Sequence, residues 1–199
     1  MDESLAVRVA SAPVTTVKGT WLRHAFAAYP ERALDGRVYD GRWGTKPGFP
    51  VLYLGNPLES IIVEAYRHLV DPVENPDLLA QIHPRILLTA DVAVTDVIDL
   101  RTAGARAAAG LTLGDLESGV DDYARCQEVA QVAHQLGRHG VLAPAATKMG
   151  ETLALFTDLT DVAGQKPVRS AADVLWEMLP PDPRIASAGT RLSMVRDDD

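Results

Sequence analysis

The stretch that decides the fold runs from Asp40 to His68 and reads DGRWGTKPGFPVLYLGNPLESIIVEAYRH. Its first part, up to Gly48, contains the glycines and prolines that are typical of turns. The apolar run 49–55 (FPVLYLG) predicts a buried strand. In the segment 57–69 apolar side chains recur three and four residues apart, which predicts an amphipathic helix. A loop, a strand and a helix therefore follow one another directly.

The sequence NPLE (56–59) marks the expected start of this helix. Asn56 is a residue type that caps helix N-termini, and Pro57 suits the first helical position. Glu59 would complete an arrangement similar to a capping box. The pair Asp71-Pro72 predicts the end of the helix.

Three polar residues stand at chemically informative places in these elements. Arg42 lies in the glycine-flanked loop, where a guanidinium can bind a phosphate or carboxylate through two hydrogen bonds. Tyr53 lies on the strand. Glu64 falls just outside the apolar stripe of the helix, so we expect it at the partly desolvated rim of the core. Taken singly, the three have plainer explanations as a surface arginine, a core tyrosine and a surface glutamate.

A fourth residue, Arg23, extends this set. The segment 20–26 (TWLRHAF) alternates with the period of a strand, and Arg23 shares one face with Trp21 and Ala25. On a buried face the guanidinium would need an anion, whereas on an edge strand it would be an exposed charge. Arginines can hold a pyrophosphate, a tyrosine ring can stack on a base, and a carboxylate can stabilise an oxocarbenium-like centre. The combination suits cleavage of an N-glycosidic bond in a dinucleotide.

The rest of the chain predicts a mixed α+β domain. Segment 28–48 is a long irregular loop, a kind of segment that is often functional. The helices are too few for a doubly wound sheet, so we expect a mixed or antiparallel sheet core flanked by helices. We assign 1–165 to this domain and 166–199 to a C-terminal helix and a loosely ordered tail from Pro180, part of the same domain or appended. Further strands are expected over 85–100, 141–145 and 151–158, and helices over 102–110 (capped by Thr102), 121–140 (ended by Gly140) and 172–179.

The composition argues against several classes of protein. The chain has 199 residues and a net charge of −8, which disfavours broad binding to nucleic acid or to an anionic membrane. Its single cysteine, Cys126, permits no internal disulfide, and the histidines share no metal-ligand spacing, so we assign no metal. No signal peptide and no apolar run of ~18 residues is apparent. We therefore expect a soluble cytoplasmic protein.

Three segments together resemble the RES domain. They are GRW at 41–43, FPVLYLGNPLESIIVE at 49–64 and GVLAPAA at 140–146. This family is named for an Arg-Glu-Ser signature and supplies the toxins of RES–Xre toxin–antitoxin systems. The resemblance extends over roughly residues 20–160, which is most of the chain.

The resemblance implies a fold like that of ADP-ribosyltransferases and an enzyme that consumes NAD. By matched position, Arg42 would contact the NAD phosphates, Tyr53 would pack on the nicotinamide side and Glu64 would be the catalytic carboxylate. Arg23 would also bind the anion, and Gln127 matches a polar position that borders the site. The resemblance further implies an Xre-like antitoxin as partner, which would block the site while bound; a homodimer is left open.

We favour phosphorolysis of NAD, with inorganic phosphate as co-substrate and no prosthetic group. Hydrolysis, ADP-ribosylation of a protein and a binding module without turnover remain alternatives. The sequence departs from the family pattern at Gly44, where asparagine is frequent, and at His24, where tyrosine is frequent. The signature serine is missing from the segment 144–147 (PAAT), where Thr147 could replace its hydroxyl if the loop shifts.

Overall fold

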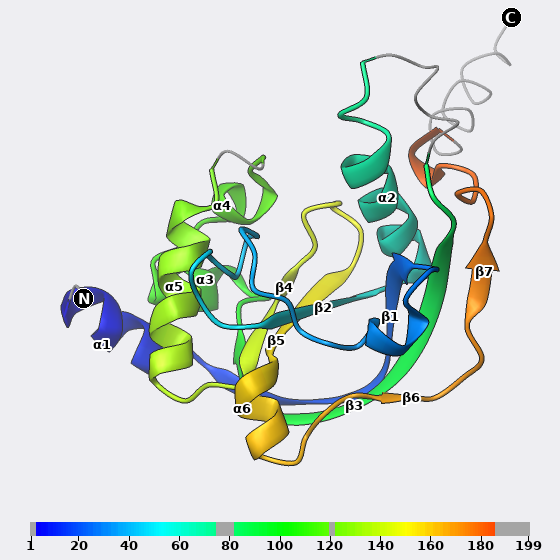
Figure 1. Ribbon diagram of the computed structural model, residues 1–199. Coiled ribbons are helices and arrows are strands. Elements are labelled where there is room, and N and C mark those ends of the chain that lie inside the picture. The colour runs from blue at the N-terminus through cyan, green and yellow to red at the C-terminus, as the bar shows by residue number, and fades with distance from the viewer. Residues whose placement is uncertain (1–2, 75–81, 120–121, 186–199) are drawn as a thin grey trace, which may run out of the picture.

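A single sheet of seven strands forms the centre of the computed structural model, which describes residues 3–74, 82–119 and 122–185 (Figure 1). The strand order is β1-β2-β5-β4-β3-β6, and β7 also pairs with β3. Because β1 pairs with β3 as well as with β2, the first five strands in this order close on themselves. The strands are β1 (Val14–Phe26), β2 (Val51–Asn56), β3 (Arg85–Asp99), β4 (Gly140–Pro144), β5 (Glu151–Phe156), β6 (Val168–Arg169) and β7 (Val174–Trp176).

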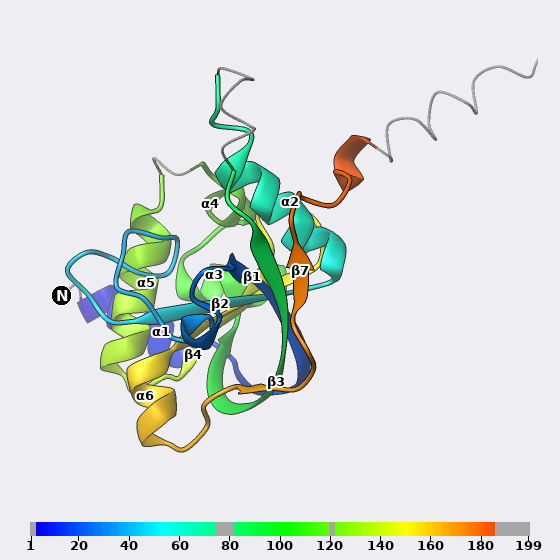
Figure 2. The same ribbon diagram turned by 45° about the vertical axis from the view of Figure 1, so that its right-hand side comes forward.

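The sheet is mixed, as predicted. Only the β3–β4 pairing is parallel, and every other pairing in the described chain is antiparallel. The helices of the described chain are α1 (Glu3–Ser11), the 3-10 helix η1 (Pro30–Arg32), α2 (Leu58–Leu69), α3 (Ala103–Ala109), α4 (Leu113–Glu117), α5 (Ala124–Gln135) and α6 (Thr157–Val162). Figure 1 and Figure 2 show α1, α3, α4 and α5 grouped on one side of the sheet, with α2 on the other side of the central strands beside β1. The expected α+β class is therefore confirmed.

Two apolar clusters divide the core at β2. Leu52 and Leu54 point to a cluster that also contains Trp21 of β1 and Leu153 of β5. Val51 points to the opposite cluster, which β2 shares with α1, α3 and α5, and Tyr53 packs against that same cluster. The alternation of a strand produces this division, since successive side chains point to opposite faces. It places Tyr53 on the face of β2 that looks toward the loop before this strand.

The start of α2 differs from the sequence-based expectation. Asn56 is not the helix cap, because it is the last residue of β2, opposite Glu151, and its side-chain amide donates to the carbonyl of Thr20 at 2.9 Å. The helix begins at Leu58 without a side-chain cap, so Pro57 precedes it and Glu59 completes no capping box. Because the Asn56 side chain is hydrogen-bonded to β1, it does not cap the helix.

The predicted helix over 172–179 is wrong. Residues 174–176 form β7, which pairs with Arg85–Leu87 at the edge of β3. The side chain of Trp176 packs against Ile61 and Ala65 of α2. Strand β3 is 15 residues long and exceeds its partner β4, so it offers unpaired backbone groups that β6 and β7 satisfy. This non-local pairing outweighs the local preference for a helix.

Other element boundaries moved by a few residues. The helix expected over 121–140 spans Ala124–Gln135 as α5, and Gly140 begins β4 instead of ending the helix. The strand expected over 151–158 ends at Phe156, where α6 begins. Helix α1 was not predicted. The Thr102 cap of α3 is confirmed, because its hydroxyl accepts a hydrogen bond from the Ala105 amide at 3.1 Å.

The segment expected as a loosely ordered tail is described only up to residue 185, and 186–199 lie outside the described residues. Arg184 forms hydrogen bonds of 2.7 and 2.9 Å with the carboxylate of Asp71, and the Tyr66 hydroxyl donates to the carbonyl of Pro180. The described part of this segment is therefore attached to α2 and the residues after it. In the part of the chain that the structure describes, no helix combines the length and apolar character that a membrane crossing needs.

Replacing Gly140 with alanine should destabilise the fold. A Cβ atom at this position would lie 2.3 Å from the carbonyl oxygen of Ala154 in the neighbouring strand, and this backbone cannot move without disturbing the sheet. We expect the free energy of unfolding to fall by ~1–3 kcal/mol, as for other overpacked core positions. Gly104→Ala is the matched control, because nothing lies within 4 Å of its added Cβ and alanine favours the helix by up to ~1 kcal/mol. Urea denaturation of both variants measures the difference, and equal stability would contradict this account.

Candidate active site

A cleft with two lobes lies between α2 and the loop before β2. The loop-side cavity has a volume of about 260 Å³ and includes Arg42 and Thr147 in its wall. The β1-side cavity has a volume of about 240 Å³ and includes Arg23. Four residues line both cavities: Tyr39, Tyr53, Glu64 and His68. The two cavities are therefore adjoining parts of one cleft that meet at these side chains.

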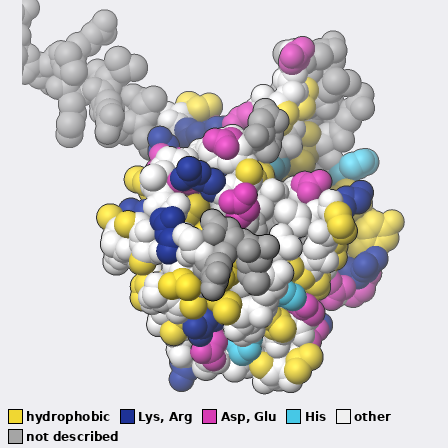
Figure 3. All heavy atoms as spheres, turned by 90° about the vertical axis from the view of Figure 1, so that its left-hand side faces the viewer, with side chains coloured by type: hydrophobic (Ala, Val, Ile, Leu, Met, Phe, Trp, Pro, Cys, Tyr) yellow, Lys and Arg dark blue, Asp and Glu magenta, His cyan; other side chains and the backbone are white. Residues whose placement is uncertain are grey.

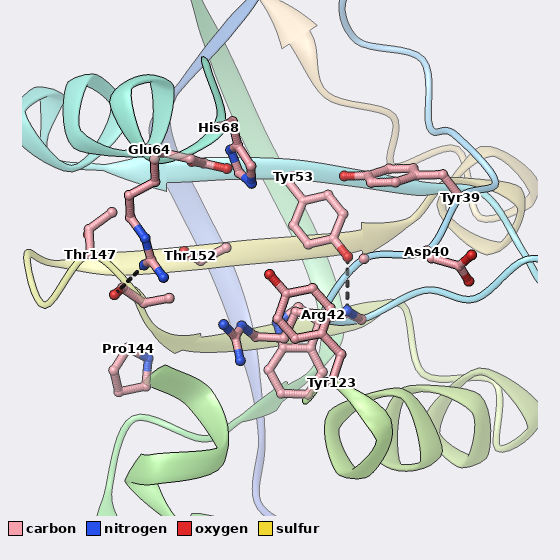
Figure 4. A pocket seen from close by; sticks show the side chains of 14 residues that line it. Tyr39, Asp40, Arg42, Tyr53, Glu64, His68, Tyr123, Pro144, Thr147 and Thr152 are labelled. Atoms are coloured by element: carbon pink, nitrogen blue, oxygen red, sulfur yellow. Dashed lines mark hydrogen bonds between the residues drawn. The ribbon is translucent and has the colours of Figure 1, made fainter. Parts of the chain in front are cut away.

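The Tyr53 ring stands at the junction of the two lobes. Its hydroxyl accepts a hydrogen bond of 2.9 Å from the backbone amide of Trp43, which Figure 4 shows as a dashed line. Burial raises the pKa of Tyr53 far above its ordinary value, so the phenol stays protonated and can still donate to a ligand. The Tyr39 ring lies nearby, with its centroid 6.1 Å from that of Tyr53. Together the two rings give the junction an aromatic wall.

Glu64 reaches the same junction from α2. Ile61 and Ala65 of this helix are buried in the core, whereas Glu64 is half-buried at the rim, as the helical periodicity predicts. His68 follows one turn later, and Figure 4 shows both side chains on the cleft side of α2. A carboxylate in this position can accept hydrogen bonds from a ligand and stabilise positive charge on it.

The guanidinium of Arg42 is largely engaged by the protein itself. It donates to the carbonyls of Asp115 and Ser118, each at 2.7 Å, and to the Ser118 hydroxyl at 3.0 Å. It also lies over the Tyr123 ring, 4.5 Å from the centroid. Arg42 thus lines the loop-side cavity and also connects the loop before β2 to α4 and to the segment that follows it.

Arg23 lies in the other lobe, where β1 and β2 pair only at Leu22 and Gly55. Its Nη1 atom donates to the carbonyl of Tyr53 at 2.8 Å, while its buried Nε atom has no hydrogen-bond partner among the described residues. Burial lowers the pKa of Arg23, and Tyr39 and Glu64 are the neighbouring groups that oppose this shift. A buried donor without a partner is costly, so an anionic ligand in this lobe would supply what the fold leaves unsatisfied.

Gln127 lines neither lobe of the cleft. Its side-chain amide donates to the carbonyls of Gly41 at 2.9 Å and Gly44 at 3.2 Å. The residue therefore lies behind the loop that carries Arg42 and fixes its backbone. The structure brings Arg42, Tyr53 and Glu64 together in one cavity and places Arg23 in the adjoining one.

Sequence reasoning did not select several residues of the cleft. Arg67 lines the loop-side cavity, and its Nη1 atom donates to the carbonyl of Ala146 at 2.5 Å. Its position three residues after Glu64 puts both on neighbouring parts of one helix face, and this spacing is a signal that could have found it. Thr147, which the sequence suggested as a possible replacement for the family serine, also lines this cavity, with its hydroxyl 2.7 Å from that of Ser60. Within the described chain, no group of three or more His, Cys, Asp or Glu side chains is arranged to hold a metal ion.

This chain is similar over most of its length to proteins of one family. The RES domain matches residues 15–177. The protein named NAD(+) phosphorylase MbcT, from Mycobacterium bovis and from Mycobacterium tuberculosis, is 30% identical over 175 residues, covering 87% of this chain and 92% of each relative. The crystal structure of the M. tuberculosis MbcT–MbcA toxin–antitoxin complex is similar with a TM-score of 0.72 and 29% identity, covering 87% of this chain and 93% of that chain.

His24, in the wall of the β1-side cavity, should make stability depend on pH. Burial, followed by the electrostatic effect of the neighbouring Arg85 and Arg23, lowers the pKa of His24 from 6.5 to about 3. Between these values the unfolded chain binds a proton that the folded chain does not. The free energy of unfolding should therefore fall by ~1.4 kcal/mol per pH unit as the pH decreases from 6.5.

The variant His24→Asn isolates this contribution, because its amide does not titrate and keeps an acceptor for Arg85, which donates to His24 at 3.3 Å. Between pH 7 and pH 5, urea denaturation should show a loss of stability smaller by ~2 kcal/mol than in the unaltered chain. Equal losses of stability in both proteins would contradict this account, because His24 would then bind a proton as readily in the folded chain as in the unfolded chain.

Proposed function

Because this chain belongs to the RES domain family, we propose that it is an enzyme that consumes NAD by cleaving the bond between nicotinamide and ribose, with inorganic phosphate as the acceptor. The observation that carries the proposal is the meeting of Tyr53 and Glu64 at the junction of two lobes that each contain arginine. The 30% identity to proteins named NAD(+) phosphorylase, over most of both chains, supports the same reaction.

The shape of the cleft suits a dinucleotide. The lobes measure about 260 and 240 Å³, and each alone is smaller than the ~300 Å³ at which sites for drug-sized ligands begin. A molecule as long as NAD would extend through both, with its glycosidic bond at the junction. The unsatisfied Nε of Arg23 would then donate a hydrogen bond to an oxygen of the pyrophosphate.

Glu64 would act on the ribose. Its carboxylate would accept a hydrogen bond from a ribose hydroxyl and stabilise the positive charge that develops as the glycosidic bond lengthens. The nicotinamide ring nitrogen is cationic in NAD, so the leaving group takes the bonding electron pair and departs neutral. No general acid is required for this step. Tyr53, which stays protonated, would pack against the nicotinamide.

Arg42 would contribute in two ways. Its positive charge would favour the NAD phosphates, and its hydrogen bonds to Asp115 and Ser118 would fix the loop that forms one wall of the cleft. Gln127 would support that wall from behind by holding Gly41 and Gly44. Arg42 would therefore act on both the shape and the charge of the site, and Gln127 on its shape alone.

The segment that lacks the family serine still presents a hydroxyl to the cleft. Ala145 is buried, while Thr147, two residues later, lines the loop-side cavity. This position supports an active enzyme over a binding module that has lost its chemistry. The segments 168–169 and 174–176 pair with β3, which supports one domain that continues past residue 165.

We further propose that an antitoxin protein, of the Xre type, covers the cleft and blocks access of NAD. The basis is the similarity to the toxin of the MbcT–MbcA toxin–antitoxin complex. An enzyme that depletes NAD would act in the cytoplasm, where its substrate is present, and would need such a partner to spare the cell that makes it.

The variant Glu64→Gln tests the proposed chemistry. It keeps the size of the side chain and removes its charge, so NAD cleavage should slow by at least ~100-fold, the scale expected for loss of one electrostatic contribution to a transition state. The assay follows NAD loss and product formation by chromatography, with and without phosphate. ADP-ribose 1″-phosphate is the expected product.

Glu59→Gln is the control, because Glu59 lies exposed in the first turn of the same helix. It should leave the rate unchanged. The proposal fails if the unaltered chain leaves NAD intact in the presence of phosphate, or if Glu64→Gln is as active as Glu59→Gln.

Growth of a bacterial host gives an independent prediction. Expression of this chain alone should arrest growth, because the NAD pool is drained, and Glu64→Ala should relieve the arrest at equal protein levels. Co-expression of the cognate antitoxin should also restore growth and should yield a complex on affinity purification. Equal growth with both forms of the toxin would contradict depletion of NAD as the cause.

A further inference from the structure

Phosphorolysis requires a second anion site in addition to the one that binds the pyrophosphate of NAD. The attacking phosphate must lie beside the ribose, close to the carboxylate of Glu64, and would be repelled by that charge. A cation in the loop-side cavity must therefore hold it. This inference rests on the proposed function and concerns the acceptor in that reaction.

The loop-side cavity has two unlike ends. In Figure 4, Tyr39 and Asp40 lie at one end, and Pro144 and Thr147 lie at the other. The first end carries the exposed carboxylate of Asp40, which disfavours an anion. The second end is formed by the connection between β4 and β5, and Glu64 lies on α2 between the two.

Arg67 carries its positive charge to this second end. Its Nη1 atom donates to the carbonyl of Ala146 at 2.5 Å, and this contact fixes the guanidinium beside Thr147. The side chain is half-buried and lines the cavity, so its charge is only partly screened by water. Among the described residues, Arg67 donates a hydrogen bond through Nη1 alone, so Nη2 and Nε can donate to an oxyanion in a forked arrangement.

Neighbouring charges leave Arg67 as the best cation for this purpose. Both Nη atoms of Arg42 are taken by Asp115 and Ser118. Lys148 is exposed and pairs with Glu117 at 3.2 Å. Glu64 lines the same cavity, and no ion pair joins it to Arg67 among the described residues. Asp71, just beyond the end of α2, has its carboxylate bound by Arg184.

Two hydroxyl groups complete this end of the cavity. Thr147 comes from the β4–β5 connection and Thr152 from β5, and both line the cavity that Arg67 lines. The Thr147 hydroxyl lies 2.7 Å from the Ser60 hydroxyl and 3.3 Å from the Met149 carbonyl, so its proton would turn from these groups to a bound oxyanion. Hydroxyl donors combined with a forked guanidinium suit a tetrahedral oxyanion. We propose that Arg67, with the hydroxyls of Thr147 and Thr152, forms the binding site for the inorganic phosphate that attacks the ribose of NAD.

The step balances without a further reactant. An oxygen of hydrogen phosphate forms a bond to C1 of the ribose as the C1–nitrogen bond breaks. Both electrons of that bond go to the ring nitrogen, and neutral nicotinamide leaves. The product is ADP-ribose 1″-phosphate, whose new phosphoryl group keeps its proton or loses it to solvent. Arg67 binds and positions the nucleophile throughout and transfers no proton.

The test compares Arg67→Gln with the unaltered chain over a range of phosphate and NAD concentrations. Loss of a charge-assisted, forked contact should raise the KM for phosphate about tenfold or more, while the KM for NAD stays within about twofold. The product should shift from ADP-ribose 1″-phosphate toward ADP-ribose, since water competes for the same centre. Arg67→Lys keeps the charge without the fork and should lie between the two.

Arg32→Gln is the matched control, because its side chain is 71% exposed on η1, outside the cleft. It should leave both KM values and the product ratio unchanged. Circular dichroism of each variant reports folding. If Arg67→Gln does not fold, the KM for phosphate and the product ratio of Arg67→Lys test the proposal instead.

The possible results distinguish a failure of the phosphate site from a failure of the proposed function. If the unaltered chain cleaves NAD and Arg67→Gln keeps its KM for phosphate, the phosphate site is wrong while the proposed function stands. An equal rise in both KM values would assign Arg67 to NAD instead of to phosphate and would also overturn the inference. If the unaltered chain cleaves NAD to ADP-ribose regardless of phosphate, water is the acceptor and no phosphate site exists. Absence of any cleavage overturns the proposed function and the inference with it.

Discussion

The insertion of Trp43 into the core is the constraint on which the site depends. This side chain is 1% exposed and anchors the loop before β2 in the apolar core. The backbone around it is fixed by the hydrogen bond from its amide to the Tyr53 hydroxyl and by the contacts of Gln127 with Gly41 and Gly44. An irregular loop thereby becomes a rigid wall of the cleft. The positions of the polar side chains in this wall therefore depend on the burial of Trp43.

The cleft concentrates positive charge in a protein whose net charge is −8. Arginines from β1, the loop before β2 and α2 reach the two lobes from different elements (Arg23, Arg42 and Arg67). Figure 3 shows that acidic and basic side chains are interspersed on another face of the molecule, without a broad basic patch on that face. Binding of an anionic dinucleotide thus depends on short-range contacts inside the cleft, where water screens less.

Much of the candidate site follows from local sequence. Turn-forming residues place Arg42 in a loop, alternation places Tyr53 on one face of a strand, and helical periodicity places Glu64 at the rim of the core. Gln127 was expected at the border of the site, yet it lies behind the loop, because its distance from the cleft is set by how α5 packs on that loop. The spacing of Arg67 from Glu64 indicates a shared helix face, but only the fold brings the β4–β5 connection to the Arg67 guanidinium.

The sequence by itself determined the α+β class, the loop, strand and helix around the cleft, and the similarity to one family, because turn chemistry, periodicity and ordered motifs are local. Only the tertiary structure decided that β1 and β3 close the sheet, that residues 174–176 form a strand and that the cleft has two lobes. These features arise from pairings between segments that are distant in the chain. Such pairings depend on which backbone edge remains unsatisfied once the other elements have packed, and no local pattern records that.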